Sequence, residues 1–331
     1  MKKFCFETVW PFLNPEFAFL AFLALLGAGL TGCSTQMLSN GTELAKVGQA
    51  ASLQMDRNAT LSAHAMLALK KAVAFNDGYN NAIGDPASRT YLANLAAIQS
   101  KLVQYGDWLE CLASAYSALG DLAAYDAVGN FDSSIDTLAT NTASFASAIG
   151  KPISIPPDAT ATVKVAGGLV LGSIQAHEVK SASRKIEILL TNVIAALDDP
   201  NTKKQIVCIQ GDVAGFIDQA ADVLFAEGIC SYAPLLDDLG APLGLRSVAK
   251  VDDVVANKQN VLAGLRNVAR ELANEQVASQ AAAYDESVAA LKSLVPLHEE
   301  LRRDVPLNLT TIINITGQLQ EMAAMFQPLQ K

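Results

Sequence analysis

The chain has 331 residues, of which 51% are hydrophobic and 17% charged, and its formal net charge at pH 7 is −9. This composition supplies enough apolar side chains for a folded core and differs from that of a disordered chain. The acidic balance, without a cluster of lysine and arginine, excludes nucleic acid as an expected partner, because phosphate groups would repel the surface.

The first 32 residues have the order of a secretory signal. Two lysines lie near the start, an apolar stretch runs over residues 17–30, and small residues precede Cys33. The stretch is shorter than the roughly 20 apolar residues that a membrane-spanning helix needs. We therefore expect residues 1–32 to be a cleaved signal peptide. The alternative is an uncleaved anchor or a core helix, with Cys33 as an ordinary thiol.

The four residues Leu30-Thr31-Gly32-Cys33 resemble the lipobox of bacterial lipoproteins. The resemblance implies cleavage before Cys33, acylation of that cysteine, and a chain held at a membrane of the bacterial cell envelope. Two or more acyl chains anchor a protein stably. Ser34 follows the cysteine, and by the same resemblance a residue other than aspartate there favours the outer membrane. We expect residues 33–42 to be a short tether from the lipidated Cys33.

The body, residues 43–331, shows apolar residues three and four positions apart over long segments, which is typical of helices. In two segments the steps alternate strictly between four and three, a period that keeps one seam facing a partner helix. We therefore expect an all-α fold, an elongated antiparallel helical bundle with coiled-coil-like heptad seams. The first seam is Tyr91, Leu95, Ile98, Leu102, Tyr105, Leu109, Leu112, Tyr116, Leu119 and Ala123. The second is Val165, Leu169, Gly172, Ala176, Val179, Ser183, Ile186, Leu190, Val193 and Leu197.

Weaker patterns predict the remaining helices and the connections. The predicted helices cover 43–75 with Thr42 as its cap, 202–227, 251–295 as the longest and ended by Pro296, and 308–326. Clusters of proline and glycine predict irregular loops near 76–87, 150–159 and 229–250. The last is the longest, and long loops are often functional.

Three cysteines follow Cys33, namely Cys111, Cys208 and Cys230. In an exported protein they would form a disulfide or remain free thiols. Because their number is odd, at least one lacks a partner within the chain.

Gly168 and Gly172 have a spacing that allows close helix packing. They lie in an uncharged stretch, Val165–Ala176, which as an alternative is loosely similar to the apolar segments of α-helical pore-forming toxins.

The sequence contains no pattern for a nucleotide-binding loop, a nucleophile elbow or a paired-histidine metal site. The three histidines, His64, His177 and His298, are far apart in sequence, and we expect them to be surface or seam-flanking side chains. We therefore expect no catalytic, cofactor-binding or metal-binding residue, and a chain that is not an enzyme.

These features together favour a membrane-tethered helical lipoprotein of the bacterial cell envelope. It would act as a structural or adaptor component with an envelope protein as its partner. One alternative is a binding module for a lipid or other apolar ligand, with a cavity beside the small seam residues Gly172, Ala176 and Ser183. Another is a membrane-active, pore-forming-like protein that uses residues 165–176.

Overall fold

The computed structural model describes residues 33–80, 84–124, 129–160, 172–207, 219–220, 223–227, 231, 233–240 and 259–326. Over these ranges the fold is all-α, as predicted, and no strand occurs. The helices are α2 (Cys33–Tyr79), α3 (Pro86–Ala123), α4 (Gly129–Ala148), α5 (Pro157–Thr160), α6 (Gly172–Leu197), α7 (Pro200–Val207), α9 (Ala233–Gly240), α11 (Gln259–Arg303) and α12 (Leu309–Phe326). The predicted signal peptide, residues 1–32, lies outside the described residues.

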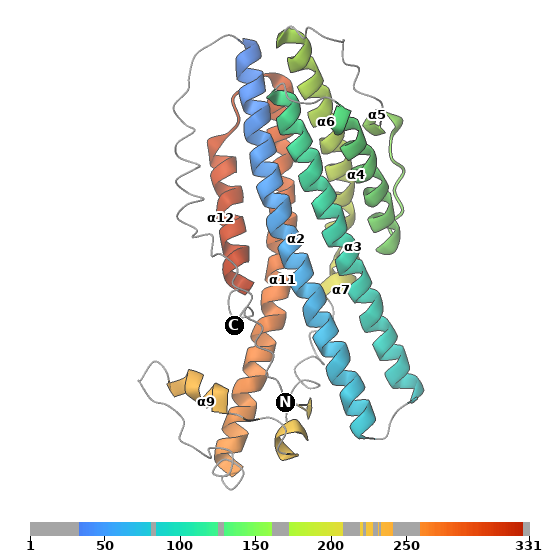
Figure 1. Ribbon diagram of the computed structural model, residues 1–331, viewed down its shortest axis with the longest axis vertical. Coiled ribbons are helices and arrows are strands. Elements are labelled where there is room, and N and C mark those ends of the chain that lie inside the picture. The colour runs from blue at the N-terminus through green and yellow to red at the C-terminus, as the bar shows by residue number, and fades with distance from the viewer. Residues whose placement is uncertain are drawn as a thin grey trace, which may run out of the picture.

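The long helices lie side by side in an elongated antiparallel bundle (Figure 1). Helices α2 and α3 form a hairpin, α12 packs against α11 and α2, and α6 packs against α3, α4 and α11. One end of the molecule, which we call the proximal end, holds Cys33, Ala123 and Arg303. The opposite end, which we call the distal end, holds the turn from α2 to α3 and the start of α11.

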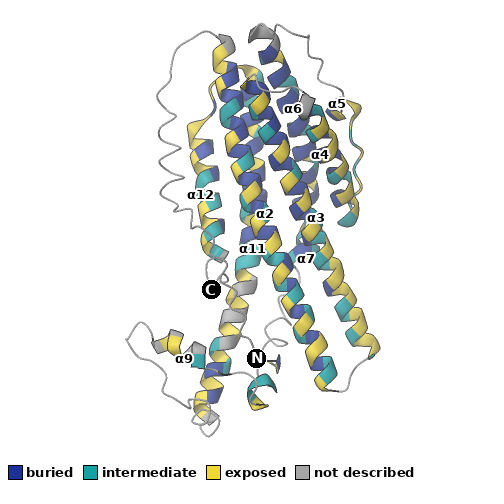
Figure 2. Ribbon diagram, in the orientation of Figure 1, coloured by how far each residue is buried: buried dark blue, intermediate teal, exposed yellow. Residues whose placement is uncertain are grey.

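Burial along α2 changes about halfway down the helix (Figure 2). Up to Ala59 the buried positions come from several faces of the helix, because α3, α6, α11 and α12 all contact α2. Beyond it they narrow to one stripe of residues three or four apart. This stripe consists of Ala63, Met66, Leu69, Val73 and Asn76. Residues 63–79 and 86–100 thus form a two-helix projection, which we call the arm.

The arm has its own small hydrophobic cluster. Leu69 and Val73 of α2 are buried against Leu95 of α3, and Tyr91 and Leu92 pack beside them. This cluster is separate from the main core, which fills the proximal part of the bundle.

The two predicted seams are buried or half-buried at the positions whose burial the structure describes. All ten residues of the first seam lie in α3 and are buried or half-buried. In the second seam the residues from Ala176 to Leu197 lie in α6 and are buried or half-buried as well. Val165 and Leu169 lie outside the described residues. The strict alternation of steps therefore located the inward faces of α3 and α6.

Helix α2 begins at Cys33, so the segment 33–42, predicted as a tether, is helical instead. The predicted cap, Thr42, lies inside the helix. Thr42 Oγ1 donates a hydrogen bond to the carbonyl of Leu38 at 3.0 Å. A Cβ atom on Gly41 would lie 2.8 Å from Val179 of α6, so glycine permits a close approach there. Burial of Met37 and Leu38 extends the helix where local propensity does not favour it.

The predicted loops are shorter than expected. In the loop 76–87, α2 continues to Tyr79 and α3 begins at Pro86, where the Asp85 carboxylate accepts the backbone N–H groups of Ala87 and Ser88. In the loop 150–159, residues 151–156 are irregular and α5 follows.

The predicted loop 229–250 contains helix α9, so that part of the prediction is wrong. The predicted helix over 202–227 begins earlier, as α7 at Pro200, and α7 ends at Val207. Residues 208–218 and 241–258 lie outside the described residues.

Helix α11 continues through Pro296 to Arg303, so the predicted interruption does not occur. Proline removes one backbone hydrogen bond from the helix. Leu294, Leu297 and Leu301 are fully buried around it, and their packing offsets the loss. Among the described residues α2 spans 47 residues and α11 spans 45, while residues 251–258 of the helix predicted to be the longest lie outside them. The predicted last helix is confirmed as α12.

The close approach of α2 to α3 depends on Gly48. A Cβ atom at this position would overlap the ring of Tyr116, which is fully buried. Glycine is otherwise unfavourable inside a helix by about 1 kcal/mol relative to alanine. The position of the Tyr116 ring therefore explains a glycine at residue 48.

We expect Gly48→Ala to lower the free energy of unfolding by about 1–3 kcal/mol, because the new methyl group forces the ring or the helix to move. The matched control is Gly264→Ala, in α11, where no atom lies within 4 Å of the new Cβ. That change should stabilise the protein by about 0.5–1 kcal/mol through helix propensity. Denaturant unfolding of both variants measures the difference. If both substitutions stabilise the chain, the ring of Tyr116 is not packed against α2.

Candidate functional site

A buried histidine joins three helices in the proximal half of the bundle. His298 of α11 lies with its Nε2 atom 2.8 Å from the hydroxyl of Tyr116 in α3. Its Nδ1 atom lies 2.8 Å from Oγ of Ser183 in α6. All three side chains are fully buried, and the rings of Tyr116 and His298 are 5.6 Å apart between centroids. We call these three residues the histidine cluster.

The histidine is neutral in the folded protein. Burial, together with the smaller effect of the nearby Arg302 guanidinium, lowers the pKa of His298 to about 3. A neutral imidazole has one donor and one acceptor nitrogen, so the two hydroxyl groups satisfy both. Burial also raises the pKa of the Tyr116 hydroxyl above its ordinary range, which keeps it protonated.

Serine beside histidine is an arrangement that enzymes use for nucleophilic catalysis. Here neither side chain has exposed surface, so a substrate has no access to Ser183 in this conformation. The arrangement instead fixes α3, α6 and α11 relative to one another through fully paired polar groups.

Sequence reasoning misplaced His298. His64 and His177 are exposed, as predicted, but His298 lies in the core. The sequence nevertheless contains a signal that residue 298 faces inward. The apolar positions of α11 include Leu291 and Val295, and the next inward position, three residues further, is residue 298. A polar residue at an inward position of this pattern predicts a buried hydrogen-bonding group.

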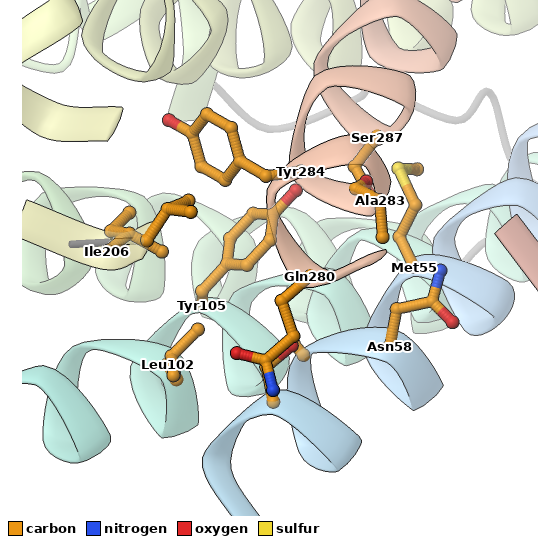
Figure 3. A pocket seen from close by; sticks show the side chains of 12 residues that line it. Met55, Asn58, Leu102, Tyr105, Ile206, Gln280, Ala283, Tyr284 and Ser287 are labelled. Carbon is orange, nitrogen blue, oxygen red and sulfur yellow. The ribbon is translucent and has the colours of Figure 1, made fainter. Parts of the chain in front are cut away.

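A second polar feature is a cavity of about 30 Å³ where the arm leaves the bundle (Figure 3). Helices α2, α3, α7 and α11 surround it. Its lining residues are Met55, Asn58, Ala59, Ser62, Leu102, Tyr105, Ile206, Val207, Gln280, Ala283, Tyr284 and Ser287. This volume admits one or two water molecules. It is far below the roughly 300–1,000 Å³ of pockets for organic ligands.

Two tyrosines line this cavity and differ in their hydrogen bonds. The hydroxyl of Tyr284 donates to the carbonyl of Leu197 at 2.7 Å. The hydroxyl of Tyr105 lies near the side chain of Ser287 but closes no well-formed hydrogen bond to a described residue, and Nδ2 of Asn58 has no partner there either. The ring of Tyr105 is held by stacking on Trp108 and Phe145, with centroids 6.1 and 5.4 Å away. Aromatic packing therefore positions Tyr105 without a hydrogen bond from its hydroxyl.

The other predicted site residues are only partly described. Cys33 is the first residue of α2, and Gly172 is the first residue of α6. Gly168, Cys208 and Cys230 lie outside the described residues.

Cys111 lies half-buried in α3 and forms no disulfide within the described ranges. Burial raises the pKa of its thiol, and the negative charges of Glu110 and Asp107 raise it further. A thiol with a raised pKa has little thiolate at neutral pH and is a slow nucleophile.

The part of the chain that the structure describes contains neither a group of metal ligands nor a membrane-spanning helix. No three histidine, cysteine, aspartate or glutamate side chains there are placed to share a metal ion. None of the helices in those ranges combines the length and the apolar character that crossing a membrane requires.

No protein-family model matches this chain, and neither a curated protein nor a solved structure matches it. The class of protein is therefore defined by its fold. It is an all-α bundle of long antiparallel helices, with a sealed histidine cluster in its proximal half and an arm at its distal end.

The histidine cluster makes stability depend on pH. The unfolded chain binds a proton on histidine near pH 6.5, whereas folded His298 does so only near pH 3. Between these values the unfolded state binds more protons, so the free energy of unfolding falls by about 1.4 kcal/mol for each pH unit of acidification. We expect a loss of about 2 kcal/mol between pH 6.5 and pH 5 from this group.

Urea unfolding of the wild type and of His298→Gln at pH 7.5, 6.5 and 5.0 isolates this contribution, since only the wild type carries the imidazole. Burial raises the pKa values of buried Glu178 and half-buried Glu187, so their protonation acts with the opposite sign, and both proteins share this contribution. If the free energy of unfolding depends on pH equally in the two proteins, His298 is not shielded from solvent. The imidazole resonances of the folded wild type, followed by NMR, give a direct second readout.

The two cavity tyrosines should respond differently to loss of the hydroxyl. Tyr284→Phe removes a hydrogen bond and leaves a carbonyl unpaired, so we expect a loss of about 1–2 kcal/mol in the free energy of unfolding. Tyr105→Phe removes no hydrogen bond to a described residue, and we expect no loss or a small gain. Thermal and urea unfolding measure both. A larger loss for Tyr105→Phe than for Tyr284→Phe would contradict the assignment of these hydroxyls.

Proposed function

We propose that this chain is a lipid-anchored helical protein of the bacterial cell envelope that acts as a structural or adaptor component, without catalysis. The supporting observation is that Cys33, the last residue of the lipobox-like sequence, already lies in α2, which runs without a break from there to Tyr79 over 47 residues. At 1.5 Å per residue the helix is about 70 Å long. An acyl group on Cys33 would thus sit at one end of a rod whose other end is the arm.

The distal end of the arm carries exposed aromatic side chains. Phe75 and Tyr79 lie one turn apart at the end of α2, with ring centroids 6.4 Å apart, and they are 38% and 51% exposed. The hydroxyl of Tyr79 donates to a carboxylate oxygen of Glu227 at 3.3 Å. Exposed aromatic residues are common at protein interfaces. The arm therefore offers a contact surface for an envelope protein about 70 Å from the proposed anchor.

The charge of the body is consistent with this proposal. A chain with a net charge of −9 is repelled by anionic lipid, so the acyl group, rather than the protein surface, would supply the membrane contact. An outer-membrane location remains part of the proposal through Ser34.

The two alternative functions have less support. Ser183, one of the small seam residues beside which a ligand cavity was expected, is fully buried and hydrogen-bonded to His298. The cavity beside Tyr105 is not lined by Ala176 or Ser183, and its volume of about 30 Å³ is too small for a lipid chain. The membrane-active alternative depends on residues 165–176, of which 161–171 lie outside the described residues. We therefore favour the adaptor.

The anchor and the contact surface are tested together in intact cells. A photocrosslinking amino acid replaces Tyr79 on the arm or, as the control, exposed Thr137 on α4. Each version is made in the wild-type, Cys33→Ser and Cys111→Ser backgrounds. We expect the chain to fractionate with membranes except in Cys33→Ser, and the mature Cys33 peptide to carry acyl mass.

We also expect one envelope protein to be crosslinked from position 79 and not from position 137, and this product to disappear in Cys33→Ser. Absence of acyl mass from the Cys33 peptide of the wild type would contradict the proposed anchor. Identical products from positions 79 and 137 would sink the arm as the contact surface.

A further inference from the structure

Helix α12 exposes the two most exposed large apolar side chains among the described residues. Ile313 is 66% exposed and Leu309 is 54% exposed, and they lie one helical turn apart. Val305, just before the helix, is 41% exposed. One turn beyond Ile313, a Cβ on Gly317 would have no atom within 4 Å, so the surface stays open there. We call Val305, Leu309, Ile313 and Gly317 the α12 ridge.

The opposite face of α12 is packed tightly against the bundle. Ile312, Ile315 and Met322 are buried, and the helix packs against α11 and α2. The exposure of Ile313 and Leu309 is therefore not a sign of loose packing, because their neighbours in sequence are sealed. These two side chains therefore expose apolar surface to water, and contact with another apolar surface would bury it.

The ridge is uncharged in an acidic protein. From Val305 to Gln320 the sequence contains no aspartate, glutamate, lysine or arginine. The whole chain has a net charge of −9, so two copies repel each other unless they meet through a neutral face. An uncharged apolar ridge on the flank of the bundle meets this condition (Figure 1). It offers no charge for recognising an oppositely charged partner.

We propose that the α12 ridge is a self-association surface that pairs with the same ridge of a second copy of this chain. In such a two-fold contact the same patch serves both copies, and residues near the axis meet their own equivalents. When the two α12 helices run antiparallel, the axis crosses them, so Ile313, between Leu309 and Gly317, lies closest to it and Leu309 of one copy packs beside the open surface over Gly317 of the other. When they run parallel, the axis follows the ridges and each ridge residue, Ile313 included, faces its own equivalent.

This proposal does not rest on acylation of Cys33. The contact is formed by protein surfaces, so it should persist in the full-length Cys33→Ser chain. Failure of the anchor and failure of the ridge are thus separate results.

The test uses the full-length Cys33→Ser chain, with and without Ile313→Lys, in sedimentation equilibrium. We expect the parent chain to form dimers and Ile313→Lys to raise the dimer dissociation constant at least about tenfold, as loss of a central interface residue does. The matched control is Val103→Lys, because Val103 is an exposed β-branched residue on α3 with 48% exposure. It should leave the dissociation constant unchanged.

A second measurement distinguishes loss of the contact from disruption of α12 by the introduced lysine. Ile313→Cys and the control Val103→Cys are each introduced into the Cys33→Ser chain and oxidised under mild conditions. Both variants keep the same native cysteines, so these cysteines contribute equally to the background. We expect a disulfide-linked dimer from Ile313→Cys and none above background from Val103→Cys. A monomeric parent chain, equal effects of the two lysine variants, or an Ile313→Cys crosslink to a different protein would each overturn the proposal.

Discussion

The position of the Tyr116 ring is the constraint on which the rest of the bundle depends. Gly48 leaves room for the ring between α2 and α3, and the hydroxyl then reaches His298 of α11, whose other nitrogen pairs with Ser183 of α6. Four helices are thus placed by one missing side chain and two hydrogen bonds. A shift of α2 would leave a ring nitrogen unpaired in the core, at a cost of about 1–3 kcal/mol. Apolar packing alone would tolerate several arrangements, whereas this cluster accepts one.

The fold class and the inward faces were predictable because they depend on repetition. Ten positions in α3 follow the same alternation of steps, and so many consistent signals outweigh any single exception. The α12 prediction succeeded for a related reason. Its isoleucines and threonines also suit a strand, but Ile312 and Ile315 keep a helical spacing.

The errors occurred where one residue was taken as decisive. Thr42 and Pro296 each signal a helix end locally, yet both lie inside helices. Tertiary burial of leucine and methionine around them outweighs a local cost of about 1–3 kcal/mol. His298 was missed because an isolated histidine has no motif, and its two partners are 115 and 182 residues away in sequence. Only the fold brings them together, as it does the residues around the cavity.

The uneven burial along α2 has a consequence for motion. Residues up to Ala59 are enclosed by four helices, so their backbone amides are released only when the whole bundle unfolds. The arm depends on one stripe and on the separate cluster of Leu69, Val73 and Leu95, so it opens at a much lower free energy. A single helix therefore belongs to two cooperative units. The outer unit is able to adjust its shape against a surface while the inner unit keeps its packing.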